Sequence, residues 1–418
     1  MNHSYHGETT KALRHTNPKS MRSRLHTILT FVVSVYWATC VLPTSADNTQ
    51  ANGDNVSMAG LSEPPRPAPV ATGQLGGVDV PSANLLKAMH GRPYVLHARG
   101  GKLNKVVAEK TLLPHDPAAS PQSVYAYLGP DGAIYARLAN IMCKSTDGGR
   151  SWTQYPAAKS FGKYAMLGNG IPILVGISAV VKDADWMVMS SEDEGRSWQI
   201  IANLQHPPGH YGGFCALVSW ADDELLALQS LIPQPEKPGA EPTRGGARSL
   251  RSSDGGKTWR QTGALLLPWC SEGGIVRTPS GKLLASLRYQ PPDRKFKHVA
   301  LVDSHDNGAS WQNFRLLTSE FGQTFSCPVA LADGTVVVVH DTRYGPGSPG
   351  SRAMISRDEG QTWENEVYYL DHTTFSGSYN TSLALEDGTI LTLAASSQAG
   401  DSVWIGTTDV VAIRWKPN

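Results

Sequence analysis

The sequence predicts an all-β fold, a six-bladed β-propeller, and two observations carry that prediction. The frame S-x-D-x-G-x-x-W occurs five times, and each copy follows a short apolar hairpin pattern. The copies begin at residues 145, 191, 252, 304 and 356, so successive starts lie 46, 61, 52 and 52 residues apart. A period near 50 residues is typical of propeller blades, and a blade is one four-stranded antiparallel unit.

The first 46 residues have the three parts of an export signal. Five basic residues and one acidic residue precede or flank an apolar run at 28–42, which is too short for a comfortable membrane span. The small residues of "PTSA" (43–46) then offer a cleavage site. We therefore expect a signal peptide at 1–46 and a secreted or periplasmic protein. An uncleaved N-terminal anchor is the alternative, and it gives the same compartment.

Residues 47–80 are rich in Pro, Gly and Ser and poor in aromatic residues, which predicts a flexible linker. The propeller is expected to occupy 81–418. Without residues 1–46 the chain has 32 basic and 35 acidic residues, a net charge of −3. That balance argues against a nucleic-acid partner and against an anionic membrane surface.

Within the propeller, hairpins are predicted where Asp-Gly or Ser-Gly separates two alternating apolar runs. Adding the two strands that flank each box gives four strands per blade. The segment at 92–113 precedes the first hairpin and is expected to lend a strand that closes the ring. The hairpin at 380–396, followed by 402–415, forms a sixth blade without a box. The hairpin sequences include "VYAYLGPDGAIYARL", "GIVRTPSGKLLASLRY", "PVALADGTVVVVHD" and "SLALEDGTILTLAAS".

The boxes themselves are read as turns rather than as catalytic sites. The Asp carboxylate can accept backbone N–H groups inside a turn, and the Gly supplies a backbone angle that other residues resist. The Trp gives a large apolar plate that packs beside the next hairpin. These roles make the boxes signatures of the fold.

Four cysteines remain after cleavage of the signal, and their spacing lacks a C-x-x-C metal pattern. Four cysteines allow three disulfide pairings that sequence cannot distinguish, but we expect buried free thiols. No metal and no cofactor are expected. The four are Cys143, Cys215, Cys270 and Cys327.

Candidate site residues come from counting along the hairpins. Glu272 lies nine residues before the turn glycine Gly281 and Arg288 lies seven after it, so the two should be neighbours at the end of the hairpin away from the turn. Tyr379 lies nine residues before Gly388, so it holds the place of Glu272 in another blade. Tyr379 and Glu272 should therefore converge at the end of the channel away from the turns. Two purely structural alternatives stay open. Glu272 and Arg288 can form an ion pair that only stabilises the hairpin, and the side chain of Tyr379 can simply fill the central channel.

With five boxes and this trio, residues 115–418 resemble the sialidase (neuraminidase) superfamily, as a divergent member. "SEGGIVRTPSGKLLASLR" is similar to the family's strand pair from Glu to Arg, and "SGSYNTSLALEDGTI" to its nucleophile strand. The resemblance implies that Tyr379 is the nucleophile and Glu272 its base. It also implies that Arg288 grips a substrate carboxylate with a second arginine, Arg352 or alternatively Arg343.

The sequence departs from the family pattern in three places. Where the first blade should open with an arginine motif, "SPQSVYAYL" has none, and the position of that arginine's acidic partner holds Ala395. Twelve residues between Gly132 and Ser145 leave no room for the loop that carries the acid/base Asp. His210 or Tyr211 could supply a proton instead, although His210 can equally be an ordinary loop histidine.

From these features we expect a secreted exo-glycosidase of sialidase type that acts, as a monomer, on a terminal sialic acid or a related acidic sugar. The expected partner is carbohydrate. A propeller that binds a glycan without cleaving it is the main alternative, and a structural or adhesion module is a third.

Overall fold

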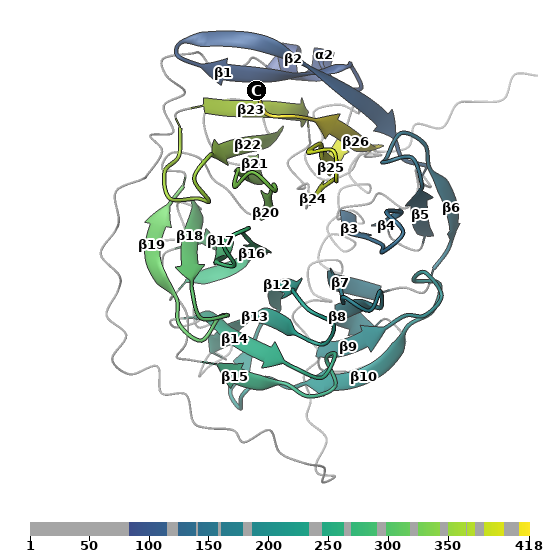
Figure 1. Cartoon of the computed structure of the whole chain (residues 1–418), viewed down its shortest axis with the longest axis vertical. Helices are drawn as coiled ribbons and strands as arrows, with labels where there is room; N and C mark the ends of the chain where they lie inside the picture. The colour runs from purple at the N-terminus through teal and green to yellow at the C-terminus, as the bar shows by residue number, and fades with distance from the viewer. Residues whose placement is uncertain are drawn as a thin grey trace, which may run out of the picture. The chain divides into compact units, whose positions relative to one another are not determined.

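The computed structural model describes much of the chain beyond residue 82 (Figure 1). The chain divides into two compact units, Met1–Thr49 and Gln50–Asn418, and every described residue belongs to the second. The predicted signal and linker therefore lie outside the described residues and stay predictions. The described ranges are 83–114, 124–138, 141–157, 160–178, 186–233, 245–262, 269–290, 298–317, 325–342, 350–364, 366–372, 380–396 and 409–418.

Four separate antiparallel sheets come first along the chain after one short helix and two strands. Helix α2 covers Ala83–Ala88. The first sheet has β3 (Val124–Leu128), β4 (Ile134–Leu138), β5 (Ile141–Ser145) and β6 (Thr153–Pro156), and the second has β7 (Ser160–Met166), β8 (Pro172–Ser178), β9 (Trp186–Ser190) and β10 (Gln199–Leu204). The third has β11 (His210–Tyr211), β12 (Phe214–Ser219), β13 (Leu225–Pro233), β14 (Gly246–Ser252) and β15 (Arg260–Thr262), and the fourth has β16 (Cys270–Arg277), β17 (Leu283–Tyr289), β18 (His298–Ser304) and β19 (Gln312–Leu316).

The fifth sheet has nine strands and contains two four-stranded sets. One set is β20 (Ser326–Ala330), β21 (Val336–Thr342), β22 (Gly350–Ser356) and β23 (Glu366–His372). The other is β24 (Thr381–Ala384), β25 (Ile390–Ser396), β26 (Asp409–Trp415) and β2 (Lys102–Leu112). Strand β1 (Tyr94–Arg99) pairs with β23 on one side and β2 on the other, so it joins the two sets.

The sheets surround one axis, as the inner strands near the centre of Figure 1 show. In the order β3, β7, β12, β16, β20 and β24, each inner strand contacts the next, and β24 contacts β3. The predicted all-β propeller is thereby confirmed. The described residues give five sheets because β1 fuses the last two sets. As expected, the segment before the first hairpin closes the ring: β2 pairs with β26, with Ala108 opposite Trp415.

The hydrophobic core lies between neighbouring sheets. Between the last and first sets of strands, for example, Leu391 and Val410 pack with Val124 and Ile134, and all four side chains are fully buried. Full burial of such a side chain stabilises the fold by about 1.5–3 kcal/mol. Because each sheet packs against two others, second strands such as β13, β17 and β21 begin with nearly continuous apolar runs.

The five boxes form the predicted turns. In the first, the Ser145 hydroxyl donates to Asp147 at 2.8 Å and accepts the Gly149 N–H at 2.8 Å. Asp147 also accepts the Ser151 N–H at 2.9 Å. Trp152 packs on the apolar cluster that contains Leu391 of the preceding set of strands. The box is therefore a hydrogen-bonded turn whose tryptophan ring packs on the hydrophobic core.

These turns predict a loss of stability in acid. The hydrogen bond from Ser310 holds the pKa of Asp306 below its usual range, and the bonds in the other boxes outweigh the opposing effect of burial. A carboxylate whose folded pKa is lowered stabilises the fold above about pH 3.9, and the contribution disappears as pH falls through the folded value.

We therefore expect the urea midpoint of the full chain to fall as pH is lowered from about 5 to 2. Asp306→Asn should be less stable than wild type at pH 7, and the difference should shrink in acid. A difference that stays constant over this range would mean that the charge of Asp306 does not stabilise the turn.

A buried ion pair fixes the segment before the first hairpin to the outer strand β23. Lys110 Nζ lies 3.1 Å from Asp371 Oδ2, and both side chains are 1% exposed or less. His90 Nδ1 lies 3.2 Å from Asp371 Oδ1. Burial works to raise the pKa of Asp371, but the hydrogen bond from His90 and the charge of Lys110 outweigh it, so the pKa is lowered.

All four cysteines in the described residues are free. Cys143, Cys215 and Cys270 are buried and Cys327 is half-buried, so the expected free thiols are confirmed and burial holds for three of them. Among the residues that the structure describes, no helix has the length and apolar character of a membrane span. The same residues contain no group of three or more His, Cys, Asp or Glu side chains placed to hold a metal ion.

Candidate functional site

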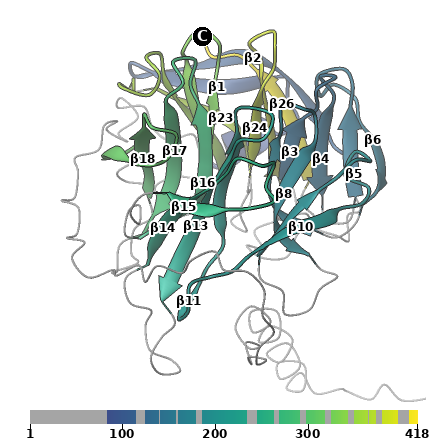
Figure 2. The ribbon, with the colours of Figure 1, turned by 60° about the horizontal axis from the view of Figure 1, so that its bottom comes forward.

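The two ends of the propeller differ in what they carry. Hairpin turns and boxes lie together at one end, since Lys282, beside the turn of β16 and β17, donates to the backbone carbonyl of Glu359 in a box. The inner strands therefore all begin at the opposite end, called here the site end. Strand β11 lies at that end, at the bottom of Figure 2. Residues near the starts of the inner strands are thus the candidates for a site.

Glu272 lies at the site end on a β-bulge of strand β16. Ser271 pairs with Arg288 and Gly273 pairs with Leu287, so Glu272 is the extra residue that the ladder leaves unpaired. A bulge re-aims a side chain and is common beside active sites. Gly273 is required here, because a Cβ would lie 1.9 Å from the carbonyl oxygen of Ser286. The motif "SEGG" therefore builds the bulge.

Arg288 contacts Glu272 as the hairpin count predicts. Its Nη1 lies 2.9 Å from Glu272 Oε2, with 21% of the Arg288 side chain and 32% of the Glu272 side chain exposed. Arg288 Nε also donates to Ser271 Oγ at 3.0 Å. The pair is thus fixed in position and still open to solvent, so a ligand can reach it. The structure brings these two residues together, and their roles stay predictions.

Two of the predicted site residues, Tyr379 and Arg343, lie outside the described residues. Asn380, directly after Tyr379, is described and is 1% exposed. Neither polar atom of its amide has a hydrogen-bond partner in the described structure. Thr381 donates to the carbonyl of Val124 at 2.7 Å, which fixes the start of β24 beside the start of β3.

Arg352 lies farther from the axis than Glu272, whereas His210 lies on a short strand that pairs with β13 on the same side as the inner strand β12. Arg352 is on the third strand of its set, 1% exposed, with its guanidinium 5.0 Å from the ring centroid of Tyr369. Burial lowers the pKa of Arg352. His210 is half-buried on β11, and its Nδ1 lies 3.0 Å from the carbonyl of Pro208. The side chain of Tyr211 is outside the described part.

Sequence reasoning missed Lys163, which lies on the inner strand β7. Its Nζ donates to the carbonyl of Gly273 at 3.0 Å, directly beside Glu272. The same ammonium lies 4.0 Å from the ring centroid of Phe325 and 5.7 Å from that of Tyr125. Lys163 therefore reaches the inner strands β16 and β3 and the residue directly before β20. The signal that could have found it is Gly162, because a glycine within a strand often marks a close backbone approach.

Gly162 indeed allows such an approach. A Cβ at this position would lie 2.2 Å from the carbonyl oxygen of Val175 on the paired strand β8. Lys163 and Glu272 thus each stand next to a glycine that allows close approach to the paired strand of the same hairpin.

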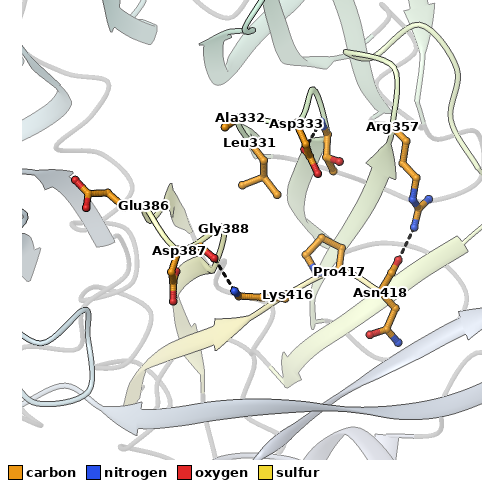
Figure 3. Close-up of a pocket in the computed structure, with 11 residues that line it drawn as sticks. Leu331, Ala332, Asp333, Arg357, Glu386, Asp387, Gly388, Lys416, Pro417 and Asn418 are labelled. Atoms are coloured by element: carbon orange, nitrogen blue, oxygen red, sulfur yellow. Dashed lines mark hydrogen bonds between the residues drawn. The ribbon is translucent and has the colours of Figure 1, made fainter.

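A cavity of about 590 Å³ lies at the other end, between the hairpin turns of the last two sets (Figure 3). Its two cations are already bonded: Lys416 donates to the carbonyl of Asp387 at 2.5 Å, and Arg357 to that of Asn418 at 2.7 Å. Neither Glu272 nor Arg288 lines it. The chemistry of the site end is therefore separate from this cavity.

Comparison with known proteins identifies the family. A model of the BNR repeat-like domain matches residues 173–392. Among curated proteins, sortilin of Danio rerio is 25% identical over 239 residues, which are 53% of this chain and 26% of that protein. The chain thus spans about a quarter of that relative's length.

Solved structures are similar in fold. A protein of unknown function from Dyadobacter fermentans has a TM-score of 0.56 at 16% identity, covering 74% of this chain and 98% of its own. An α-L-arabinanase of Penicillium chrysogenum gives 0.48 at 15%, with 71% and 92% covered. Trypanosoma rangeli sialidase gives 0.46 at 13%, with 78% and 58% covered. At these identities the similarity concerns the fold alone.

Proposed function

The chain belongs to the BNR repeat-like domain family, and we propose that it is a glycosidase that removes a terminal acidic sugar, a sialic acid or a related one, from glycoconjugates. The observation that carries the proposal is the Glu272–Arg288 pair, presented by a bulge at the site end with both side chains partly exposed. The carboxylate of Glu272 can accept a proton, and the guanidinium of Arg288 can bind a substrate carboxylate through two parallel hydrogen bonds.

Tyr379 is the proposed nucleophile. Its phenol oxygen bonds to the anomeric carbon while its proton passes to Glu272, and the glycosidic C–O bond breaks with both electrons going to the aglycone. Water then attacks the anomeric carbon, the bond to the Tyr379 oxygen breaks, and that oxygen takes back the proton from Glu272, which releases the sugar and restores both residues. A neutral phenol suits an acidic sugar, because a carboxylate nucleophile would be repelled by the sugar's own carboxylate. The contact of Lys163 supports the short distance between inner strands that this step needs. Since one lysine side chain reaches from β7 to β16, these inner strands are close together beside Glu272.

The proton that an ordinary alcohol aglycone needs is assigned to His210 or Tyr211. Both precede β12 at the site end. Aryl glycosides need this donor less, since an aryl aglycone leaves as a stabilised phenolate. They are therefore the substrates of choice for a first assay. Export by the predicted signal would place the enzyme where glycoconjugates are found.

The proposal is tested with the full chain and 4-methylumbelliferyl glycosides. N-acetylneuraminide and glucuronide are the acidic members, and galactoside and glucoside are the neutral controls. We expect fluorophore release from at least one acidic glycoside and from neither neutral one. Release from the neutral sugars alone would contradict the proposal.

Binding without cleavage is the second candidate, favoured by the absence of an arginine in "SPQSVYAYL" and by Ala395. It predicts that calorimetry detects binding of an acidic sugar while none of the aryl glycosides is cleaved. A chain that neither binds nor cleaves these sugars would contradict both candidates.

A further inference from the structure

The ammonium of Lys163 is held in the channel without a neutralising carboxylate. In the described residues no carboxylate oxygen lies within 4 Å of its Nζ, and its hydrogen bond goes to the uncharged carbonyl of Gly273. Glu272, the nearby acid, is engaged by Arg288 at 2.9 Å. Of the three N–H donors of Lys163, the described structure pairs one. Two donors and a net positive charge therefore remain for a ligand.

The surrounding groups make that charge effective. The six inner strands, as the structure describes them, contain one carboxylate, that of Glu272, whereas Lys163 and Arg288 are both cationic at the site end. The faces of Phe325 and Tyr125 stabilise the ammonium and keep it partly dry. An electrostatic attraction is stronger in such surroundings than in water. The site end is therefore suited to an anion.

We propose that the ammonium of Lys163 binds the carboxylate of the acidic sugar, in the role that the first-blade arginine would have had. This inference rests on the proposed function and adds the residue that selects acidic over neutral sugars. Lys163 donates its two remaining N–H groups to the sugar carboxylate, and Arg288 lies beside it as the second cation. The positive charge that the first blade lacks is thus supplied by Lys163 on β7, the inner strand of the second blade.

The charge of Lys163 should change in mildly alkaline solution. Burial lowers the pKa of Lys163 to about 8, opposed by the neighbouring Cys327, Cys215 and Glu272. The thiols stay neutral, because burial raises the pKa of Cys215 to about 12 and raises that of Cys327. The Glu272–Arg288 pair and Tyr125 are the other groups that face Lys163. Carboxylate binding should therefore weaken as pH rises through about 8.

The test is calorimetric titration of the full chain with N-acetylneuraminic acid and with glucuronic acid, at pH 6.5 and 9.5. We expect Lys163→Met to weaken binding by about 10- to 100-fold at pH 6.5, as the loss of a charge-assisted hydrogen bond does. Lys163→Arg, which keeps its charge at pH 9.5, should retain binding there, whereas wild type should lose it. Lys144→Met should bind as wild type does.

Lys144 is a matched control because it is also a partly exposed lysine beside an aromatic ring. Lys144 is on strand β5, and its Nζ lies 2.6 Å from Glu194 Oε1 and 5.1 Å from the ring centroid of Tyr135. A second readout is acetylation of Lys163 by acetic anhydride, mapped on peptides, which the bound sugar acid should slow. This readout decides the matter if Lys163→Met does not fold.

The outcomes separate the two proposals. If wild type binds an acid but Lys163→Met binds it equally, or the sugar leaves acetylation of Lys163 unchanged, the assignment of Lys163 is wrong and the proposed function stands. If wild type binds neither acid, the assignment of Lys163 is overturned, and the proposed function is overturned with it only if no acidic glycoside is cleaved either. Weaker binding by Lys163→Met together with protection from acetylation supports both.

Discussion

Replacing Glu272 by glutamine is expected to lower kcat on an acidic aryl glycoside by about 10²- to 10⁴-fold, the usual contribution of a positioned general base. Glutamine keeps the shape of Glu272 and its place on the bulge, but it cannot accept the proton of the attacking phenol. The substrate should still bind, since Lys163 and Arg288 are unchanged. The measurement is the initial rate of 4-methylumbelliferone release over a range of substrate concentrations.

The chain provides a matched control for this variant. Glu224 and Arg251 form an ion pair of the same length, 2.9 Å, with 26% and 24% of their side chains exposed. Glu224 precedes β13 at the turn end, so Glu224→Gln removes a comparable pair away from the site. We expect it to leave kcat unchanged. Equal losses in both variants would mean that Glu272 acts only through the stability of the fold.

Asp371→Ala is expected to destabilise the protein by about 3–5 kcal/mol, the cost of leaving a buried charge without its partner. Lys110, whose side chain is 0% exposed, would lose the carboxylate at 3.1 Å. His90, 2% exposed at its side chain, would lose its contact as well. The measurement is urea unfolding followed by tryptophan fluorescence, with the midpoint and slope fitted together.

The control for this prediction is Glu109→Ala on the same strand, β2. Glu109 pairs with Arg150 at 2.7 Å and lies 3.6 Å from Arg414, but the side chains of Glu109 and Arg150 are both 52% exposed. Exposed pairs contribute little, because water and salt screen them. A small effect in both variants would show that β2 is not held in place by the buried pair.

The fold could be read from the sequence because its signals are local and repeated. Each box carries its own hydrogen bonds, such as Ser145 to Asp147, and short turns such as Asp333-Gly334 set the register of their hairpins. Counting from Gly281 also placed Glu272 beside Arg288 correctly, since both lie on one hairpin. The fusion of the last two sets through β1 was not foreseen, because pairing with β23 depends on strands far apart in the sequence.

Contacts between different blades were harder to predict. Lys163 on β7 meets Gly273 on β16, two places along the ring of inner strands and 110 residues away in the sequence, and no count along one hairpin reveals such a contact. The burial of Arg352 against Tyr369 depends on how the third and outer strands of its set pack. Long-range side-chain contacts need the distances between sheets, which a periodic pattern does not contain.

The hydrolase assignment is tested most directly by the rate at which the full-length Tyr379→Phe variant releases 4-methylumbelliferone from an acidic glycoside that wild type cleaves. Phenylalanine keeps the ring and removes only the oxygen that would bond to the sugar. The expected result is loss of turnover with binding of the sugar acid retained. Full turnover by Tyr379→Phe would contradict the role of this phenol as nucleophile.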